Sequence, residues 1–315
     1  MSANRQQLIQ QFIEYRKASN RWNSSYESNL LNFNDFCTQT YGDNALTQEM
    51  VDTWMRPKGS ETHQSCNSRV QVIRTFLSYL HERNLTTIVT PEALAVSPNQ
   101  YIPHAFSDEE LTQFFQKCDQ HVEMEQKPRD AFQSLLYSVI FRLLYSSGMR
   151  TTEARMLWSE DVDIQQGVID IRETKANIQH YVVLDEDVRI MLERFDLVAR
   201  SFFPDRKYFF PSRSGGIIST GTLNWRFQKI WKQVSTTRAV PYDLRHNYAI
   251  KNINSWIDVG FGYHDKLLRL SKSMGHTNLE ATKYYYSLVP ALADTIVRKS
   301  GKGFDEIVPE VRKND

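Results

Sequence analysis

Gly275 and His276 stand shortly before three consecutive tyrosines, residues 284–286, near the carboxyl end of this chain. A glycine at such a place is typical of a helix end, and Thr277 or Asn278 can begin the helix that follows. A phenol at the far end of that short helix can fold back towards the imidazole. Such a fold would place a weak nucleophile beside a hydrogen-bond donor or acid. The alternative is that the tyrosines pack with solvated hydroxyls and that the Gly-His pair only caps a helix.

Two cationic residues occur earlier in the chain, each at a predicted turn. Arg150 follows a Ser-Ser-Gly break and precedes a helix N-terminus, where backbone N–H groups also favour an anion. Lys175 lies at the turn of a predicted β-hairpin and is the only lysine between Lys127 and Lys207. This isolation favours a role beyond solubility, although a lysine at a hairpin tip commonly only faces solvent.

The stretch from 217 to 257 is basic, although the whole chain carries a net charge of only +1. Its single acid is Asp243, and a helix that begins after Pro241 places Tyr242 and Arg245 on adjacent turns. A locally basic face would suit phosphate binding, and a solvated helix surface is the alternative. The basic residues of the stretch are Arg226, Lys229, Lys232, Arg238, Arg245 and Lys251.

Residues 1 to about 90 are predicted to form four short amphipathic helices, because apolar residues recur there at helical spacing. The apolar groups lie at 8–15, 26–36, 51–54 and 70–80. The last helix also carries Arg69 and Arg74, beside polar side chains such as Asn67 and Ser68. This mixture suits contacts with backbone phosphates and some base edges. Solvent exposure would explain it equally well.

A stretch that contains prolines and lacks periodicity, residues 93–104, is predicted to be a linker. Ser107 and Glu110 then form a predicted capping box, so the second domain begins near Phe106. Its other expected elements are helices over about 131–145, from 152, over 186–202, over 222–234 and after Pro241, and strands over 168–171 and 181–184.

The composition excludes several classes of protein. With 41% hydrophobic residues the chain is not intrinsically disordered, and 315 residues fit two domains. No apolar run reaches the roughly 20 residues that span a bilayer, and the first residues lack the apolar core of a signal peptide. We therefore expect a cytoplasmic protein without a membrane partner. Cys37, Cys66 and Cys118 are scattered and lack metal-ligand spacing, so neither disulfides nor a metal site is expected.

Five of these features together resemble the tyrosine recombinase family, the phage-integrase and Xer-like DNA strand transferases. They are GMRTTEA with Arg150, the hairpin residue Lys175, YDLRH with Arg245, MGH with His276, and Tyr285 nine residues beyond that histidine. Their order, spacing and element types agree over residues about 104 to 290, and five such motifs in order make chance a poor explanation. The helical bundle before them is similar to the core-binding domain of that family, by pattern rather than by motif.

The resemblance implies a multidomain fold. An all-α, SAM-like core-binding bundle would occupy residues 1–92, followed by a linker over 93–104. A mainly α catalytic domain with a small antiparallel β-sheet would occupy 105–288. Residues 289–315 would form a tail, with a short helix that packs on a neighbouring protomer. The basic residues expected to contact DNA are Arg69, Arg74, Arg226 and Lys229.

The resemblance also implies that the chain cuts and rejoins double-stranded DNA within a homo-oligomer, expected to be a tetramer on synapsed DNA. Arg150 and Arg245 would clamp the non-bridging oxygens of the scissile phosphate. Lys175 would protonate the departing 5′ oxygen, and His276 would hydrogen-bond the phosphate or assist proton transfer. Tyr285 would attack to leave a 3′-phosphotyrosyl link. Because that link conserves the energy of the broken bond, no cofactor and no metal are expected.

One position departs from the family pattern. Tyr242 stands where a histidine is usual, three residues before the second arginine. A phenol can donate a hydrogen bond but is a poor base at neutral pH, so the site would lean more on Lys175 and His276. Two alternatives stay open: a DNA-binding protein that keeps the fold without the chemistry, and a type IB topoisomerase-like activity.

Overall fold

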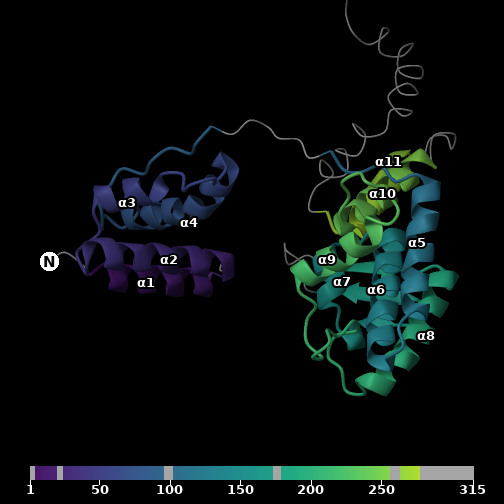
Figure 1. Cartoon of the computed structure of the whole chain (residues 1–315). Coiled ribbons are helices and arrows are strands. Elements are labelled where there is room, and N and C mark those ends of the chain that lie inside the picture. The colour runs from purple at the N-terminus through teal and green to yellow at the C-terminus, as the bar shows by residue number, and fades with distance from the viewer. Residues whose placement is uncertain (1–3, 20–23, 96–101, 173–178, 256–262, 277–315) are drawn as a thin grey trace, which may run out of the picture. The chain divides into compact units, whose positions relative to one another are not determined.

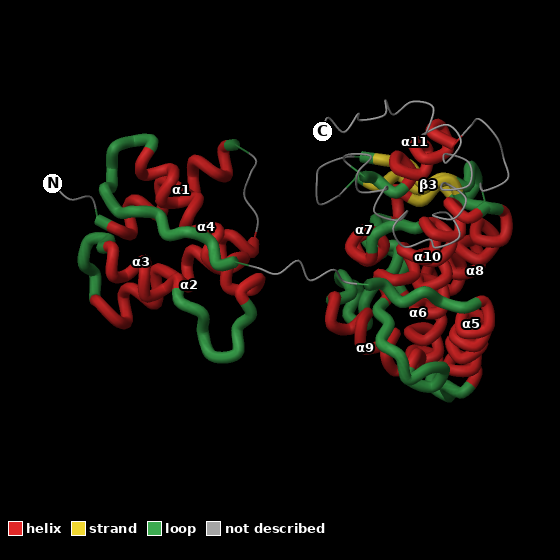
Figure 2. The backbone as a smooth tube through the Cα atoms, turned by 90° about the horizontal axis from the view of Figure 1, so that it is seen from above, coloured by secondary structure: helices red, strands yellow, loops and turns green. Residues whose placement is uncertain are grey.

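The computed structural model of the chain describes residues 4–19, 24–95, 102–172, 179–255 and 263–276. The chain divides into two compact units, Met1–Tyr101 and Ile102–Asp315 (Figures 1 and 2). This boundary falls inside the predicted linker, residues 93–104. Each unit has a hydrophobic core of its own.

The first unit is a helical bundle, as predicted. Its described helices are α1 (Arg5–Ala18), α2 (Ser24–Tyr41), α3 (Gln48–Met55) and α4 (His63–His81). Phe12, Phe33 and Ile73, which belong to the predicted apolar groups, are completely buried between them. Thr47 and Thr62 cap α3 and α4, since each side chain accepts a backbone N–H of the first turn.

Most of the described part of the second unit is also helical. Its described helices are α5 (Asp108–Glu123), α6 (Pro128–Ser147), α7 (Thr151–Met156), α8 (Glu186–Phe202), α9 (Thr220–Trp231), α10 (Pro241–Asn254) and α11 (Tyr263–Ser273), with a 3₁₀ turn at Ser159–Asp161. The central helix α6 packs against α5, α8 and α10 (Figure 1). Leu136, Ile140 and Leu144 of α6 are completely buried. A helix that is apolar on most sides is stable only when neighbours cover it.

A three-stranded antiparallel sheet lies in the second unit. Its order is β1 (Val162–Asp163), β2 (Val168–Ile171) and β3 (His180–Val183). The sequence predicted β2 correctly, placed β3 one residue too late, and missed β1, which is too short to show alternation. Ile171 pairs with His180. Ile169, Ile171, His180 and Val182 are all buried, so alternate residues of β2 and β3 face the core.

Local capping signals set the starts of three helices. The predicted capping box of α5 is confirmed: Ser107 Oγ accepts the N–H of Glu110, and the Glu110 carboxylate accepts the N–H of Ser107. Helix α9 begins at Thr220, earlier than predicted, because Ser219 caps it. Helix α6 begins at Pro128, since proline has no N–H to lose at the first helical position.

Two helices end at glycines in the left-handed conformation. Helix α6 ends at Gly148, with φ +64°, and Gly275 follows α11 with φ +63°. The N–H of Gly275 donates to the carbonyl of Lys272 and the N–H of His276 to that of Ser271, both at 2.9 Å. This pair of bonds is the Schellman arrangement. The prediction that Gly275 ends a helix is confirmed, and the same bonds fix the backbone of His276.

We expect Gly148→Ala to destabilise the second unit more than Gly167→Ala does. Both glycines have positive φ, +64° and +65°, so at either position a Cβ costs about 1–2 kcal/mol of backbone strain. At Gly148 the Cβ would also lie 2.2 Å from Cδ1 of Tyr248, whereas at Gly167 the nearest atoms are 3.7 Å away. Overpacking adds about 1–3 kcal/mol at Gly148. Urea unfolding measures both losses, and equal losses would contradict this account.

Candidate active site

Arg150 lies in the turn before the N-terminus of α7, as predicted. Its main-chain N–H donates to Glu153 Oε2 at 2.6 Å, and its Nη1 donates to Glu153 Oε1 at 2.5 Å. Its Nη2 donates to the carbonyl oxygen of Gly275 at 2.6 Å. The side chain of Glu153 is only 1% exposed. A buried carboxylate therefore orients the guanidinium of Arg150, which reaches from α7 to the end of α11.

Arg245 on α10 is 1% exposed, so its charge is almost wholly removed from water. Its Nη1 donates to the carbonyl oxygen of Gly148 at 2.5 Å, and its Nη2 donates to that of Met274 at 2.9 Å and to His276 Nε2 at 2.8 Å. A buried cation is costly unless hydrogen bonds compensate it. The carbonyls at a helix C-terminus lack partners within the helix and carry partial negative charge. Arg245 thus joins the carboxyl ends of α6 and α11.

Arg150, Arg245 and His276 therefore converge at the carboxyl end of α11, as the predicted site requires. Helix α11 packs against α10 and against β3 (Figure 2). The bond from Arg150 to Gly275 spans 125 residues of sequence, so only the fold brings these motifs together. Two guanidinium groups at one place suit the paired non-bridging oxygens of a phosphodiester.

His276 is held in its neutral form. Its pKa falls to about 4, because burial disfavours the charged ring and because Arg245 and then Arg150 lie nearby. An arginine can only donate, so the Nε2 atom facing Arg245 must accept, and the ring proton is then on Nδ1. At neutral pH His276 is consequently a neutral N–H donor rather than an imidazolium acid.

Tyr242, the predicted substitute for a histidine, lies one turn before the buried His246, a residue of the YDLRH motif for which no role was predicted. The ring of His246 is 5.0 Å from that of Tyr242, edge to face. The pKa of His246 falls to about 4, through burial and then through Arg245. Tyr242 itself is 38% exposed, whereas Arg245 is buried. The phenol is therefore accessible from solvent beside a neutral imidazole.

Glu153 and His180 are two buried residues of the site that the sequence analysis missed. His180 Nε2 lies 4.0 Å from Glu153 Oε2. A Cβ at Gly275 would come within 2.5 Å of the His180 ring, so this ring fills the space beside the glycine. Glu153 had a local signal, because a glutamate at the third position of a helix is part of a capping box. His180 had none, since only tertiary packing brings it here.

Lys175 and Tyr285 lie outside the described residues, as do Tyr284 and Tyr286. In sequence, Lys175 lies between the last residue of β2, Ile171, and the first residue of β3, His180. These two strand residues pair with each other. His180 belongs to the site by its contacts with Glu153 and Gly275. The roles of Lys175 and Tyr285 stay predictions.

The predicted DNA contacts Arg226 and Lys229 lie on α9 around Trp225, whose ring is exposed. The guanidinium carbon of Arg226 is 5.2 Å from the centre of the Trp225 ring, and Lys229 Nζ is 5.7 Å from it. Arg226 also lines a groove of about 480 Å³ together with Arg213 and several hydroxyl side chains. A basic, partly aromatic surface of this kind is compatible with a nucleic-acid backbone.

The other two predicted DNA contacts lie on α4 in the first unit. Arg69 pairs with Glu61 at 2.8 Å and is largely buried, and Arg74 is half-buried. The contact of Arg69 and Arg74 with DNA stays a prediction.

Within the described ranges, no group of three or more His, Cys, Asp or Glu side chains is placed to hold a metal ion. No helix of those ranges is long and apolar enough to cross a membrane. Cys37, Cys66 and Cys118 are free thiols, all buried. Burial raises the pKa of Cys37 to about 11 and that of Cys118 to about 12, so neither is a thiolate at neutral pH.

The stability of the second unit is expected to fall as the pH drops from about 6.5 towards 4. His246 and His276 have a pKa of about 4 in the folded chain against an ordinary value of 6.5. Between these values the unfolded chain binds more protons than the folded one, so the free energy of unfolding decreases with falling pH. Urea unfolding at pH 7.0 and 5.5 measures the difference.

A double variant, His246→Asn with His276→Asn, serves as the control for this pH dependence. It will be less stable at both pH values because packing is lost. Its loss between pH 7.0 and 5.5 is expected to be smaller than that of the native chain. An unchanged loss would show that other groups titrate.

Comparison with known proteins places the chain in a family. The profile of the Phage integrase family matches residues 106–291. The putative integrase/recombinase y4rB of Sinorhizobium fredii is 23% identical over 314 residues, which cover 95% of this chain and 98% of that protein. The tyrosine recombinase XerC of Staphylococcus saprophyticus is 24% identical over 271 residues, which cover 83% and 84% of the two chains.

Two solved structures have the same fold. The XerH site-specific recombinase bound to difH substrate matches with a TM-score of 0.58 and 18% identity, over 83% of this chain and 74% of that one. The Tn1549 transposon integrase in complex with circular intermediate DNA matches with a TM-score of 0.58 and 12% identity, over 88% and 94%. The predicted fold class, a mainly helical multidomain protein with a small antiparallel sheet, is confirmed. Because the family profile covers more than half of its residues, the chain belongs to the phage integrase family of tyrosine recombinases.

Proposed function

We propose that this chain is a site-specific DNA recombinase, which cuts and rejoins DNA strands through a covalent 3′-phosphotyrosyl intermediate. The observation that carries the proposal is the meeting of Arg150, Arg245 and His276 at the end of α11. Membership of the phage integrase family supports it. So do the names of the relatives, which are an integrase/recombinase and a tyrosine recombinase.

Arg150 and Arg245 are proposed to bind the non-bridging oxygens of the scissile phosphate. A guanidinium has five N–H donors in a planar fork, and Glu153 and Gly275 each accept one from the Arg150 side chain. The phosphate is proposed to accept from N–H donors of the two guanidinium groups that these acceptors leave free, such as Nε of Arg245, while Glu153 and the main-chain carbonyls hold the groups in place. His276 then adds a neutral hydrogen bond. Donors that are already oriented need little reorganisation as charge develops on the phosphate.

The chemical step follows from the residues that the resemblance supplies. The phenolic oxygen of Tyr285 gives its proton to solvent water and bonds to phosphorus, and the bond from phosphorus to the 5′ oxygen breaks. That oxygen takes a proton from Lys175, and the proton that Lys175 gives is replaced from solvent. The reverse attack by a 5′ hydroxyl on the phosphotyrosyl link rejoins a strand. Exchange of partner strands between the two steps produces recombination.

The proposed partners are double-stranded DNA and further copies of the chain. A tetramer on synapsed DNA is expected, with the short helix predicted between Val289 and Ser300 packed on a neighbouring protomer. The cytoplasmic location expected from the sequence is part of the same proposal.

Tyr242 is proposed to act as a hydrogen-bond donor rather than as a proton shuttle. Tyr242→Phe is expected to slow cleavage by less than about tenfold, because one neutral hydrogen bond contributes about 0.5–1.5 kcal/mol. Tyr242→His is expected to be tolerated, since a histidine is usual there. Single-turnover cleavage measures both variants. A Phe variant as inactive as one that lacks Arg150 would contradict this role.

Tyr285 is predicted to be the nucleophile. On a substrate nicked beside the cleavage point, the native chain should accumulate a 3′-linked protein–DNA adduct, because the broken flank diffuses away before religation. Tyr285→Phe removes the attacking oxygen and keeps the ring, so it should bind the DNA and form no adduct. Denaturing gels with end-labelled DNA detect the adduct.

Tyr284→Phe and Tyr286→Phe are the matched controls, and both should still form the adduct. Successive residues of a helix point about 100° apart, so only one of the three can face the phosphate. An adduct with Tyr285→Phe but not with one of the neighbours would move the nucleophile by one residue. No adduct with the native chain would favour a DNA-binding protein without the chemistry. Relaxation of supercoils by monomers without sequence preference would favour topoisomerase action.

A further inference from the structure

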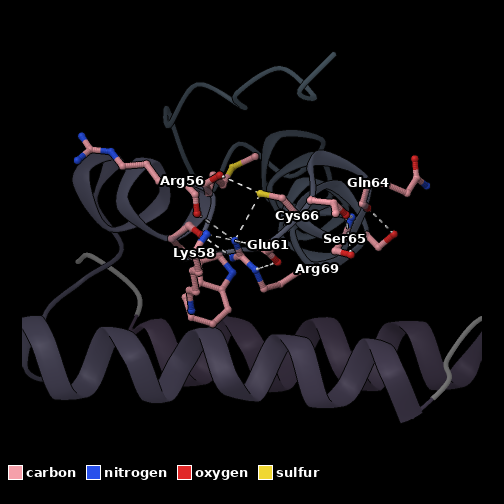
Figure 3. Close-up of polar contacts among 11 residues, drawn as sticks. Arg56, Lys58, Glu61, Gln64, Ser65, Cys66 and Arg69 are labelled. Atoms are coloured by element: carbon pink, nitrogen blue, oxygen red, sulfur yellow. Dashed lines mark hydrogen bonds and ion pairs between the residues drawn. The ribbon is translucent and has the colours of Figure 1, made fainter. Parts of the chain in front are cut away.

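One guanidinium organises the segment between α3 and α4, residues 56–62, in the first unit (Figure 3). Nη1 of Arg69 donates to the carbonyl oxygen of Trp54 at 2.6 Å, and Nη2 donates to that of Arg56 at 3.0 Å. Nε and Nη2 also donate to the two carboxylate oxygens of Glu61, at 2.9 and 2.8 Å. Arg69 therefore ties the end of α3 to the residue that precedes the cap of α4.

Glu61 also fixes the backbone of the segment at Lys58. Its Oε2 accepts the N–H of Lys58 at 3.1 Å, and its own N–H donates to the carbonyl of Lys58 at 2.8 Å. The hydrogen bonds from Arg69 are the largest of the effects that lower the pKa of Glu61 to about 2, so the carboxylate is charged at every working pH. Gly59 supplies the positive φ, +50°, that closes the turn.

The result is a segment that presents two exposed cations, Arg56 and Lys58. In Figure 3 the side chain of Arg56 points away from the cluster around Arg69. Lys58 Nζ lies 3.6 Å from the centre of the Trp54 ring, which limits its range of positions. Desolvation and then the nearby Arg69 lower the pKa of Lys58, whereas Glu61 raises it. The side chain of Arg69, by contrast, is mostly covered.

We propose that Arg56 and Lys58 bind the phosphodiester backbone of duplex DNA, and that Arg69 and Glu61 are positioning residues that hold the segment for this contact. This inference rests on the proposed function. It assigns Arg69 an indirect role, because its fork is already engaged by Glu61 and by two main-chain carbonyls. It also adds two DNA contacts that the pattern of α4 did not indicate, since they lie outside the helix.

The effect of Glu61→Gln on DNA affinity shows whether Arg69 contacts DNA itself or positions the segment. The two roles predict changes of opposite sign. The substitution removes a negative charge near the DNA, which by electrostatics alone strengthens binding and frees Arg69. If Glu61 positions the segment, the same substitution weakens binding, because an amide offers one acceptor where the carboxylate offered two and its NH₂ group opposes a donor. We expect an affinity loss of roughly threefold to tenfold, and a salt slope of log K against log salt that is shallower by about 0.9 per lost phosphate contact.

The measurement is fluorescence anisotropy of the full chain with a short duplex of mixed sequence, between about 50 and 200 mM salt. Glu82→Gln is the matched control. It removes the same charge from an exposed residue at the other end of α4, and it should leave binding equal or slightly tighter. Arg56→Gln and Lys58→Gln test the contacts directly, and each is expected to make the slope shallower by about 0.9. Thermal unfolding shows whether each variant is folded.

The double variant Glu61→Gln with Lys58→Gln completes a cycle. The double variant should lose less binding free energy than the two single variants lose together, because both substitutions act on one phosphate contact. Additive losses, or tighter binding by Glu61→Gln with an unchanged slope, would overturn the positioning role while the proposed function stands. Unchanged binding by Arg56→Gln and Lys58→Gln would overturn the contact. A native chain that does not bind duplex DNA would instead overturn the proposed function.

Discussion

The arrangement of the second unit depends on the burial of one cation, the guanidinium of Arg245. Removal of a charge from water is tolerated only when hydrogen bonds compensate it. Here the acceptors are main-chain carbonyls at the ends of α6 and α11 and one nitrogen of His276. These carbonyls are available because a helix leaves its last four without partners. The cation and the two helix ends therefore require one another, and the candidate active site forms where they meet.

Burial, followed by this positive charge, keeps the two histidines of the site neutral. Arg150 and Arg245 lower the pKa of His276, after burial, and Arg245 does the same to His246. Glu153 is the carboxylate that hydrogen-bonds Arg150, and it lies on the side away from solvent. The acceptors that surround the two cations are thus the Glu153 carboxylate, main-chain carbonyls and one nitrogen of His276. Two arginines beside two neutral imidazoles give this site a positive field, which favours an anionic ligand.

Much of this arrangement could be predicted from the sequence. Helical periodicity indicated the bundle and the order of helices, and Ser107 and Gly275 mark a helix start and a helix end by local rules that do not depend on the rest of the chain. Arg150 and His276 were recognisable because one lies at the start of α7 and the other follows the end of α11. Strand β1 and the exact start of β3 were not predictable, since two residues show no alternation and a buried histidine does not look like a core residue. The engagement of Arg69 by Glu61 was also hidden, because eight residues of sequence separate a pair that only the turn between α3 and α4 brings together.

The contact of His180 with Gly275 has a mechanical consequence. The imidazole occupies the volume that any other residue at 275 would need, and its Nε2 is 4.0 Å from the carboxylate that orients Arg150. The rigid ring of His180 thus lies between β3, α7 and the end of α11. A displacement of one of these elements therefore displaces the other two. Close-packed interiors have low compressibility, so such a displacement is transmitted to neighbouring residues. A displacement of β3 would therefore be passed to Gly275 and, through Glu153, to the guanidinium of Arg150.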